Sequence, residues 1–443
     1  MTDLIVSRLK QYSPQKIGII STDSLSFAYD DKYLSSPSRT PLSCSLPLRK
    51  EPFTLEEFRP YFEGLLAEGT ARQALAAKLQ LPEENWLGML SVCGKECIGD
   101  ILVTSSSEVI PQEHAYKPID IENLRDIFLN LANTAEENTA LRLSLAGAQN
   151  KTALAHNPSM SITEGWFQPV GLAATTHILK ASQIRDIPEV EFLCMKAAEA
   201  CGINVANVFL LDIGNPVLAV ERFDRKISES NEDFEVTRLH QEDLAQAFGI
   251  TPGSKYAEIK NNSIASITSF LKVSSKQPAR DIAQFARMLC FTYLIGDCDA
   301  HLKNFSVLQQ EENLDNNKVS QEKNIQDERN KVLPTLSLSP AYDLVSTTYF
   351  PRYSRDMAMN YGGLRTIDEI SARSFEQVAF DLGVTKAALQ GIARVCINNT
   401  HKAIQAAGDG KMGAVLESTP YVADDLIEDI LPREAILEEF CAS

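Results

Sequence analysis

Acidic, basic and amide side chains crowd into residues 294–308, which have the sequence LIGDCDAHLKNFSVL. Asp299 stands five residues before Asn304, the spacing of a protein-kinase catalytic loop. In such a loop the aspartate accepts the proton of the attacking hydroxyl, and the asparagine binds magnesium. Asp343, in SPAYDL about forty residues later, follows a predicted strand and would be the second metal ligand. Each aspartate alone could cap a helix or sit in a turn, but together with Asn304 they predict phosphoryl transfer.

Two more polar residues, His301 and Lys303, lie inside the same loop. A lone histidine is more often structural than catalytic, but one placed between the base and the metal ligand could reach a phosphate. We therefore predict a functional role for His301. Lys303 could neutralise a transferred phosphate or could be solvated, and the sequence leaves both open.

Phosphoryl transfer also needs a lysine for the phosphates and a glutamate that holds this lysine. Lys180 ends the segment TTHILK, in a strand predicted at 177–180. Glu191, eleven residues later, begins a helix predicted at 190–200 that stops at Gly202. The two side chains could pair as they do in kinases, or both could be exposed.

Small residues mark the segment 143–153, LSLAGAQNKTA, which lies between two predicted strands. Ala146, Gly147 and Ala148 would let backbone N–H groups approach a phosphate. The segment has one glycine and matches neither G-x-G-x-x-G nor G-x-x-x-x-G-K-[ST], so an ordinary hairpin is the alternative.

The charged segment ERFDRK, residues 221–226, follows a strand predicted at 217–220. A hinge between two lobes is expected at this point, and its backbone could hydrogen-bond an adenine ring. The same cluster of charges would also suit a solvated turn.

Composition narrows the class of protein. The 443 residues are 44% hydrophobic and 23% charged, which is typical of a soluble globular chain with two or three domains. The net charge of −17 argues against direct binding to nucleic acid, because phosphates would be repelled over most of the surface. No signal peptide or membrane span is predicted. The nine cysteines form no C-x-x-C pair and the six histidines show no ligand spacing, so we expect reduced thiols, no structural zinc and a cytoplasmic location.

The remaining segments are expected to form three units around these motifs. We predict that residues 1–110 form a small mixed unit and that residues 111–223 form a small lobe with the phosphate loop. Residues 224–443 are predicted to form a helical lobe with the catalytic loop. The polar stretch 309–331 is poor in apolar residues, cannot repay its ordering entropy, and is expected to be a mobile loop. Strands are predicted at 17–20, 25–29, 101–103, 141–145 and 151–155, and a linker is predicted at 108–118. One helix is expected after a capping box of Thr54 and Glu57, and another is capped by Asp120. A third helix ends at Gly296 and has Ile282, Phe285, Leu289 and Tyr293 on one face.

Taken together, these stretches resemble the HipA family, the bacterial toxin kinases of type II toxin–antitoxin modules. The matching segments are SLAGAQNKTAL, TTHILK, ERFDR, QEDLAQAFG, LIGDCDAHLKNFSV and SPAYDL, in family order. The N-terminal unit, with PLSCSLPL, also resembles the small amino-terminal subdomain of the family. The resemblance therefore extends over nearly the whole chain.

This resemblance implies a serine/threonine protein kinase that uses ATP and Mg²⁺. The implied fold is α+β and two-lobed, protein-kinase-like, with a small mixed amino-terminal subdomain and a helical carboxy-terminal lobe. Asp299 becomes the catalytic aspartate, and Asn304 and Asp343 become the magnesium ligands. The implied ATP-binding residues are Ala146, Gly147, Ala148, Gln149, Asn150, Lys151, Lys180, Glu221, Arg222, Phe223, His301, Leu302, Lys303, Asn304, Tyr342 and Asp343.

The resemblance also implies a regulatory site and partners. Ser144 matches the serine that family members autophosphorylate, and a phosphate there would add about −1.5 to −2 charge, repel nucleotide phosphates and expel the loop. Family members are neutralised by a HipB-like helix-turn-helix antitoxin, through which alone they meet DNA. Their targets point to aminoacyl-tRNA synthetases, notably the glutamyl enzyme, whose phosphorylation halts translation and favours persistence. The long insert 309–331 and the residues Asp297 and Cys298 depart from the family pattern.

The sequence thus predicts a cytoplasmic kinase toxin that acts on a protein substrate and does not bind membranes. Two alternatives remain at this point. One is a kinase-fold enzyme that phosphorylates a small molecule. The other is a non-catalytic scaffold or corepressor, which the complete set of Lys180, Asp299, Asn304 and Asp343 opposes.

Overall fold

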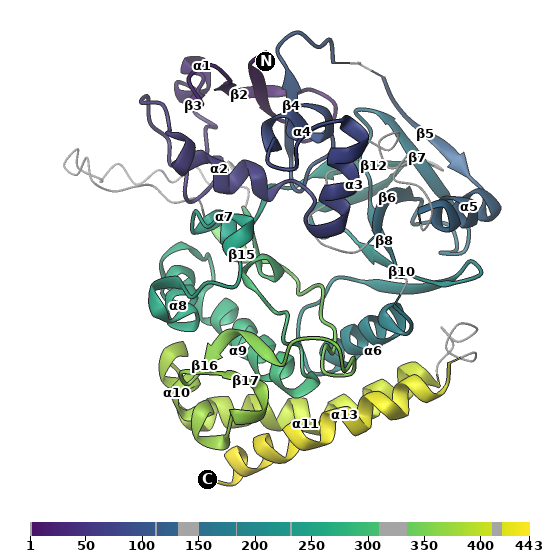
Figure 1. Cartoon of the computed structure of the whole chain (residues 1–443), viewed down its shortest axis with the longest axis vertical. Helices are drawn as coiled ribbons and strands as arrows, with labels where there is room; N and C mark the ends of the chain where they lie inside the picture. Colours follow the sequence, from purple (N-terminus) through teal and green to yellow (C-terminus); the bar gives the residue numbers. More distant parts are fainter. Residues whose placement is uncertain are drawn as a thin grey trace.

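A computed structural model shows two β-rich units at one end of the molecule and a helical unit at the other (Figure 1). The predicted strand at 141–145 lies outside the described residues, as does the predicted mobile insert after residue 309. No helix among the residues that the structure describes is long and apolar enough to cross a membrane. The structure describes residues 2–110, 113–131, 150–182, 184–230, 233–309, 335–409 and 419–443.

The N-terminal unit is an antiparallel sheet covered by short helices. Its strand order is β3-β2-β1-β4, and its core includes Phe27, Phe58 and Trp86. The strands predicted at 17–20, 25–29 and 101–103 are confirmed within this sheet, and the capping box of Thr54 and Glu57 starts α2 as predicted. The elements are β1 (Leu4–Arg8), β2 (Gln15–Ser21), β3 (Ser26–Tyr29), β4 (Ile101–Ser105), α1 (Asp31–Leu34), α2 (Leu55–Gly64), α3 (Gly69–Leu79) and α4 (Trp86–Cys93).

The second unit is a six-stranded antiparallel sheet with the order β5-β7-β6-β8-β10-β9. Helix α6 packs against β9 and β10. Lys151 of β6 and Lys180 of β8 are direct partners in the register, so two cations lie side by side on this sheet. The elements are β5 (His114–Ile119), β6 (Asn150–His156), β7 (Trp166–Gly171), β8 (His177–Ala181), β9 (Val208–Asp212), β10 (Pro216–Glu221), α5 (Ile121–Leu131) and α6 (Ile187–Ala200).

Two predictions in this unit are wrong in their bounds. The linker predicted at 108–118 contains most of β5, an edge strand that pairs with β7. Because β5 is largely exposed and contains Pro118, it lacks the apolar alternation that marks a half-buried strand. Helix α6 begins at Ile187, three residues before the predicted start, with a proline in its first turn. Glu191 consequently lies inside the helix and not at its start.

A β-hairpin, β11 (Arg225–Ser230) with β12 (Asp233–Arg238), opens the region that was predicted to be helical from residue 224. Phe234 and Val236 pack with Ala155 and Ala174, so the hairpin lies against the six-stranded sheet. The expectation of a helical start is therefore wrong for this segment. The domain boundary at 223/224 itself stays a prediction.

The helical unit has the largest core, in which α6, α9, α11 and α13 pack together. Helix α9 ends at Gly296, as predicted; its φ is +72°, and a Cβ at this position would lie 1.9 Å from Thr348 Oγ1, so glycine is required there. The elements are β13 (Gln241–Asp243), α7 (Leu244–Ala247), α8 (Ser263–Ser274), α9 (Pro278–Ile295), β14 (Ser306–Gln309), β15 (Leu336–Leu338), β16 (Asp356–Tyr361), β17 (Leu364–Thr366), α10 (Ala372–Leu382), α11 (Lys386–Gly408) and α13 (Tyr421–Ala442).

A buried histidine in the six-stranded sheet predicts a pH-dependent stability. His177 lies against the rings of Trp166 and His156, and burial lowers its pKa to about 3. Its ordinary pKa is about 6.5, so between these values the unfolded chain binds a proton that the folded chain does not. The free energy of unfolding should therefore decrease as the pH is lowered through this window. This residue should contribute a decrease on the order of 1.4 kcal/mol per pH unit. Urea unfolding at pH 7 and pH 5 should show a smaller loss for His177→Phe than for the unaltered chain; equal losses would contradict the prediction.

Candidate active site

A cleft with a volume of about 250 Å³ lies between the six-stranded sheet and the helical unit. Strands β6, β8 and β10 line one side, and the loop after α9 and the segment around Tyr342 line the other. Every predicted site residue for which the structure describes the side chain, other than Leu302, lines this cleft. These residues are Lys151, Lys180, Glu191, Glu221, Arg222, Phe223, Asp299, His301, Lys303, Asn304, Tyr342 and Asp343.

The strand lysine and the helix glutamate form the predicted pair. Lys180 Nζ donates a hydrogen bond to Glu191 Oε1 over 2.5 Å, and both side chains are buried. The exposed alternative is therefore wrong. Lys180 also bonds Asp343, and Lys151 Nζ lies 3.6 Å from the second oxygen of Asp343. Burial alone would lower the pKa of Lys180, but the carboxylates of Asp343 and Glu191 raise it above its ordinary value. The lysine is thus held charged at the sheet face of the cleft.

Asp343 is held in an unusual backbone conformation. Its φ is +54°, in the left-handed region that a residue with a Cβ rarely adopts. Burial alone would raise the pKa of this carboxyl, but Lys151 and Lys180 lower it below its ordinary value. Strained backbone that persists at a cleft indicates a functional constraint. Here it presents an ionised carboxylate to two lysines.

The predicted catalytic loop is folded tightly on itself. The backbone N–H of His301 donates to the carbonyl of Asp299 over 2.6 Å, and the backbone N–H of Asn304 donates to the carbonyl of His301 over 2.9 Å. Asn304 Nδ2 also donates to the Asp299 carbonyl over 3.4 Å. The amide nitrogen is thereby used within the loop, which leaves the amide oxygen as the atom available to a cation.

His301 enters the cleft as a neutral imidazole. Burial, aided by the charge of Lys255, lowers its pKa to about 4. At neutral pH it could donate one N–H to a phosphate but would not add a positive charge. Its predicted contact with phosphate stays a prediction.

Lys303 is turned toward the N-terminal unit. Its Nζ donates to the Gly64 carbonyl over 3.0 Å and lies 3.1 Å from Glu68 Oε1 and 3.3 Å from Asp243 Oδ2. The side chain is buried, so the solvated alternative is wrong. Its contacts with Gly64 and Glu68 hold this loop against the N-terminal unit. Nothing in its local sequence indicates these partners.

The predicted hinge contributes an apolar wall. The rings of Phe223 and Tyr342 lie 5.3 Å apart, beside Val220 and Ile178 of the sheet. Such a wall suits a planar base that stacks between aromatic and aliphatic side chains. Tyr342 is fixed there because its hydroxyl donates to the carbonyl of Lys303 over 2.7 Å.

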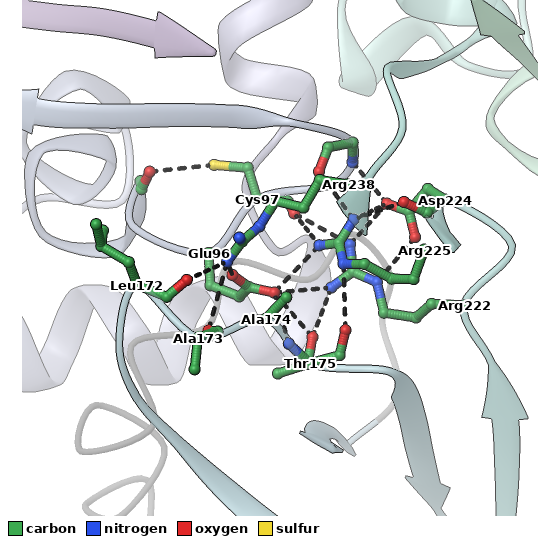
Figure 2. A network of polar contacts seen from close by, with 12 residues as sticks. Glu96, Cys97, Leu172, Ala173, Ala174, Thr175, Arg222, Asp224, Arg225 and Arg238 are labelled. Atoms are coloured by element: carbon green, nitrogen blue, oxygen red, sulfur yellow. Dashed lines mark hydrogen bonds and ion pairs between the residues drawn. The ribbon is translucent and has the colours of Figure 1, made fainter. Parts of the chain in front are cut away.

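The arginines of the hinge have other partners. Figure 2 shows Glu96 of the N-terminal unit at the centre of Arg222, Arg225 and Arg238, with Asp224 beside them. Arg222 donates two hydrogen bonds to Asp224, at 2.9 and 2.7 Å. The solvated-turn alternative is wrong, because these side chains are buried. The guanidinium of Arg222 is used in this network, so a contact of Arg222 with ATP would have to use its backbone.

The donor set fits a magnesium ion that also binds nucleotide phosphates. Asn304 and Asp343 both line the cleft and offer an amide and a carboxylate oxygen. Magnesium is commonly held by one or two such groups plus phosphates and water. Among the residues that the structure describes there is no cluster of three or more His, Cys, Asp or Glu side chains that could hold a metal. With Asn304 and Asp343 as its protein ligands, the predicted site would take its other ligands from phosphates and water.

Some predicted residues cannot be placed in the cleft. Ser144, Ala146, Gly147, Ala148 and Gln149 lie outside the described residues. Asn150 begins β6, next to Lys151, and Leu302 is buried in a 3₁₀ turn of the catalytic loop.

Comparison with known proteins gives the family. The N-terminal unit matches the HipA N-terminal domain over residues 11–104, and more than half of the chain, residues 143–404, matches the HipA-like C-terminal domain. Two proteins of Sinorhizobium fredii are similar to the chain. “Putative kinase Y4mE” is 33% identical over 370 residues, which is 81% of each chain, and “Putative kinase Y4dM” is 28% identical over 377 residues, 80% of this chain and 79% of that one.

Two further comparisons involve Shewanella oneidensis. Its “Serine/threonine-protein kinase toxin HipA” is 27% identical over 365 residues, 77% of this chain and 76% of that one. The solved structure of the Shewanella oneidensis MR-1 HipA, HipB and operator DNA complex matches with a TM-score of 0.77 and 21% identity, over 99% of both chains. The predicted two-lobed α+β fold is thereby confirmed. From both family matches and the 33% identical relative, the chain belongs to the HipA family.

Proposed function

We propose that this chain is a toxin kinase that transfers the γ-phosphate of ATP to a serine or threonine of a cellular protein. One observation carries the proposal: five residues from four separate segments of the chain, Lys180, Glu191, Asp299, Asn304 and Asp343, line a single cleft. Those are the parts that phosphoryl transfer requires of a kinase. The relatives named as kinases support the same activity.

Each of these cleft residues would have a separate role in the transfer reaction. Asp299 would accept the proton of the acceptor hydroxyl, and Lys180, oriented by Glu191, would hold the nucleotide phosphates. Asn304 and Asp343 would hold magnesium, which when bound neutralises charge on the phosphates. Asp343 now bonds Lys180, so binding of a cation would have to compete with that ion pair.

The antitoxin and the regulation follow from the family. We propose a HipB-like helix-turn-helix antitoxin as partner, in line with the HipA–HipB–operator complex of Shewanella oneidensis. DNA would be reached through that antitoxin, because the chain's net charge of −17 opposes direct contact. Autophosphorylation at Ser144 would inactivate the kinase by placing negative charge beside the nucleotide phosphates. We further propose a cytoplasmic location, an aminoacyl-tRNA synthetase as target, and persistence as the outcome.

A comparison of protein and small-molecule acceptors in separate reactions tests the activity. Purified full-length chain is incubated with γ-³²P-ATP and Mg²⁺, alone, with a bacterial protein extract, and with a panel of small hydroxyl compounds including aminoglycosides. We expect labelled serine or threonine in protein and no label in the small compounds. Label in a small compound and none in protein would instead identify a metabolite phosphotransferase. The same reactions with EDTA should show no transfer, since magnesium is required.

A further inference from the structure

The proposed catalytic carboxylate has a neighbour that no motif indicated. The hydroxyl of Tyr256 donates a hydrogen bond to Oδ1 of Asp299 over 2.5 Å. The Tyr256 ring lies edge-on to His301, with the ring centroids 5.2 Å apart. Tyr256 therefore contacts two residues of the catalytic loop from a segment 43 residues earlier in the chain.

The segment that carries Tyr256 is fixed on several sides. Lys255 Nζ lies 3.0 Å from Glu68 Oε2 of the N-terminal unit, and the Lys255 carbonyl accepts from the backbone N–H of Leu302 over 3.4 Å. The carbonyl of Tyr256 accepts from Arg365 Nη2 over 2.6 Å. These contacts come from the N-terminal unit, the catalytic loop and β17. Tyr256 is therefore held in a fixed position beside Asp299 by contacts from three parts of the chain.

The geometry at Asp299 leaves one carboxylate oxygen available to the hydroxyl group that receives the phosphate. A carboxylate accepts hydrogen bonds at both oxygens, and its plane turns readily because the torsion that orients it is broad. Among the described residues, Tyr256 donates the one side-chain hydrogen bond to this carboxylate, and it uses Oδ1. That bond fixes the carboxylate plane, so Oδ2 can point into the cleft toward an incoming hydroxyl.

We propose that Tyr256 is a positioning residue of the phosphoryl-transfer reaction. Its hydroxyl holds Asp299 in the orientation in which the free oxygen accepts the proton of the acceptor hydroxyl. The inference rests on the proposed function, because it assumes that Asp299 is the base. Tyr256 does not bind nucleotide in this scheme, so it affects the rate of transfer and not the binding of ATP.

The substitution Tyr256→Phe tests this role because it removes the hydroxyl and keeps the ring against His301. The rate of ³²P incorporation from Mg-ATP into the full-length chain is measured over a range of ATP concentrations. We expect the maximal rate to fall on the order of 10-fold, part of the about 10²–10⁴ that a positioned base supplies, with the half-saturating ATP concentration unchanged. The thermal shift produced by a non-hydrolysable ATP analogue should also be unchanged, which shows that the variant is folded and binds nucleotide.

A matched control removes the same kind of bond elsewhere. The hydroxyl of Tyr421 donates to Asp186 Oδ1 over 2.8 Å, outside the cleft, and Tyr421→Phe should leave both kinetic values unchanged. An unchanged maximal rate in Tyr256→Phe would overturn the proposal. So would a faster rate, because it would mean that the tyrosine hydroxyl competes with the acceptor for Asp299. If the unaltered chain transfers no phosphate to any acceptor, the proposed function fails and the inference fails with it.

Discussion

Asp299→Asn is expected to reduce phosphate transfer by about 10²–10⁴-fold, the contribution typical of a positioned general base. Asparagine has nearly the same shape, and its side-chain oxygen can still accept the hydrogen bond from Tyr256. It cannot accept a proton at neutral pH. The loss should therefore be in the chemical step, measured as the rate of ³²P transfer from Mg-ATP to protein.

Binding of nucleotide should survive this substitution. Lys180, Asn304 and Asp343 remain in place, so the thermal shift caused by Mg-ATP should match that of the unaltered chain. Asp424→Asn is the control, since Asp424 is exposed on α13, away from the cleft, and should have no effect on the rate. Transfer at an undiminished rate in Asp299→Asn would show that another group is the base.

Residues within the catalytic motifs could be found from sequence because their spacing is local. Asp299 and Asn304 lie in one loop, and a helix ending at Gly296 leads into it, as the apolar periodicity indicated. Lys180 and Glu191 could be named as a possible pair from a strand and the next helix, but their spacing equally allowed two exposed side chains, and the structure shows the contact. In each case a few neighbouring residues determine the element, whereas the direction of the Lys180 and Glu191 side chains depends on packing.

Partners supplied by distant segments could not be found in this way. Tyr256 has no motif around it, and its contact with Asp299 exists because the segment is held by Arg365 and Glu68. The sequence around Lys303 allowed either exposure to solvent or contact with a phosphate, whereas in the structure Lys303 donates a hydrogen bond to the distant Gly64 carbonyl. Long-range packing decides such contacts, and spacing along the chain carries no record of it.

The hairpin of β11 and β12 is a different kind of error, because a signal was present. Residues 233–237, DFEVT, alternate polar and apolar side chains, and the two apolar ones, Phe234 and Val236, are buried. Alternation of this kind predicts a half-buried strand. The charged ERFDRK segment, where the hairpin begins, suited a hinge or a solvated turn, whereas its arginines are neutralised by carboxylates that include Glu96 of the N-terminal unit.

That carboxylate, Glu96, leads to the second large prediction. It is buried and accepts hydrogen bonds from Arg225 over 3.1 Å and from Arg238 over 2.8 Å, with Arg222 at 3.4 Å (Figure 2). Burial alone would raise its pKa, but the three guanidinium groups lower it below its ordinary value. Glu96→Ala leaves Asp224 beside Arg222 and Arg225 but removes the carboxylate that Arg238 contacts. Removing one member of a buried charge network typically costs about 3–5 kcal/mol.

Both stability and catalysis should respond to Glu96→Ala, because the network joins the N-terminal unit to the segment that follows β10. We expect a lower free energy of unfolding in urea and, since Phe223 lies between Arg222 and Asp224, a higher half-saturating ATP concentration. The control is Glu376→Ala, which removes an exposed ion pair with Lys386; solvent screens that pair, so its loss should change stability little. If the two variants unfold at the same urea concentration, the network contributes no more than a surface pair. If Glu96→Ala loses stability but binds ATP normally, the network holds the N-terminal unit in place without positioning the hinge.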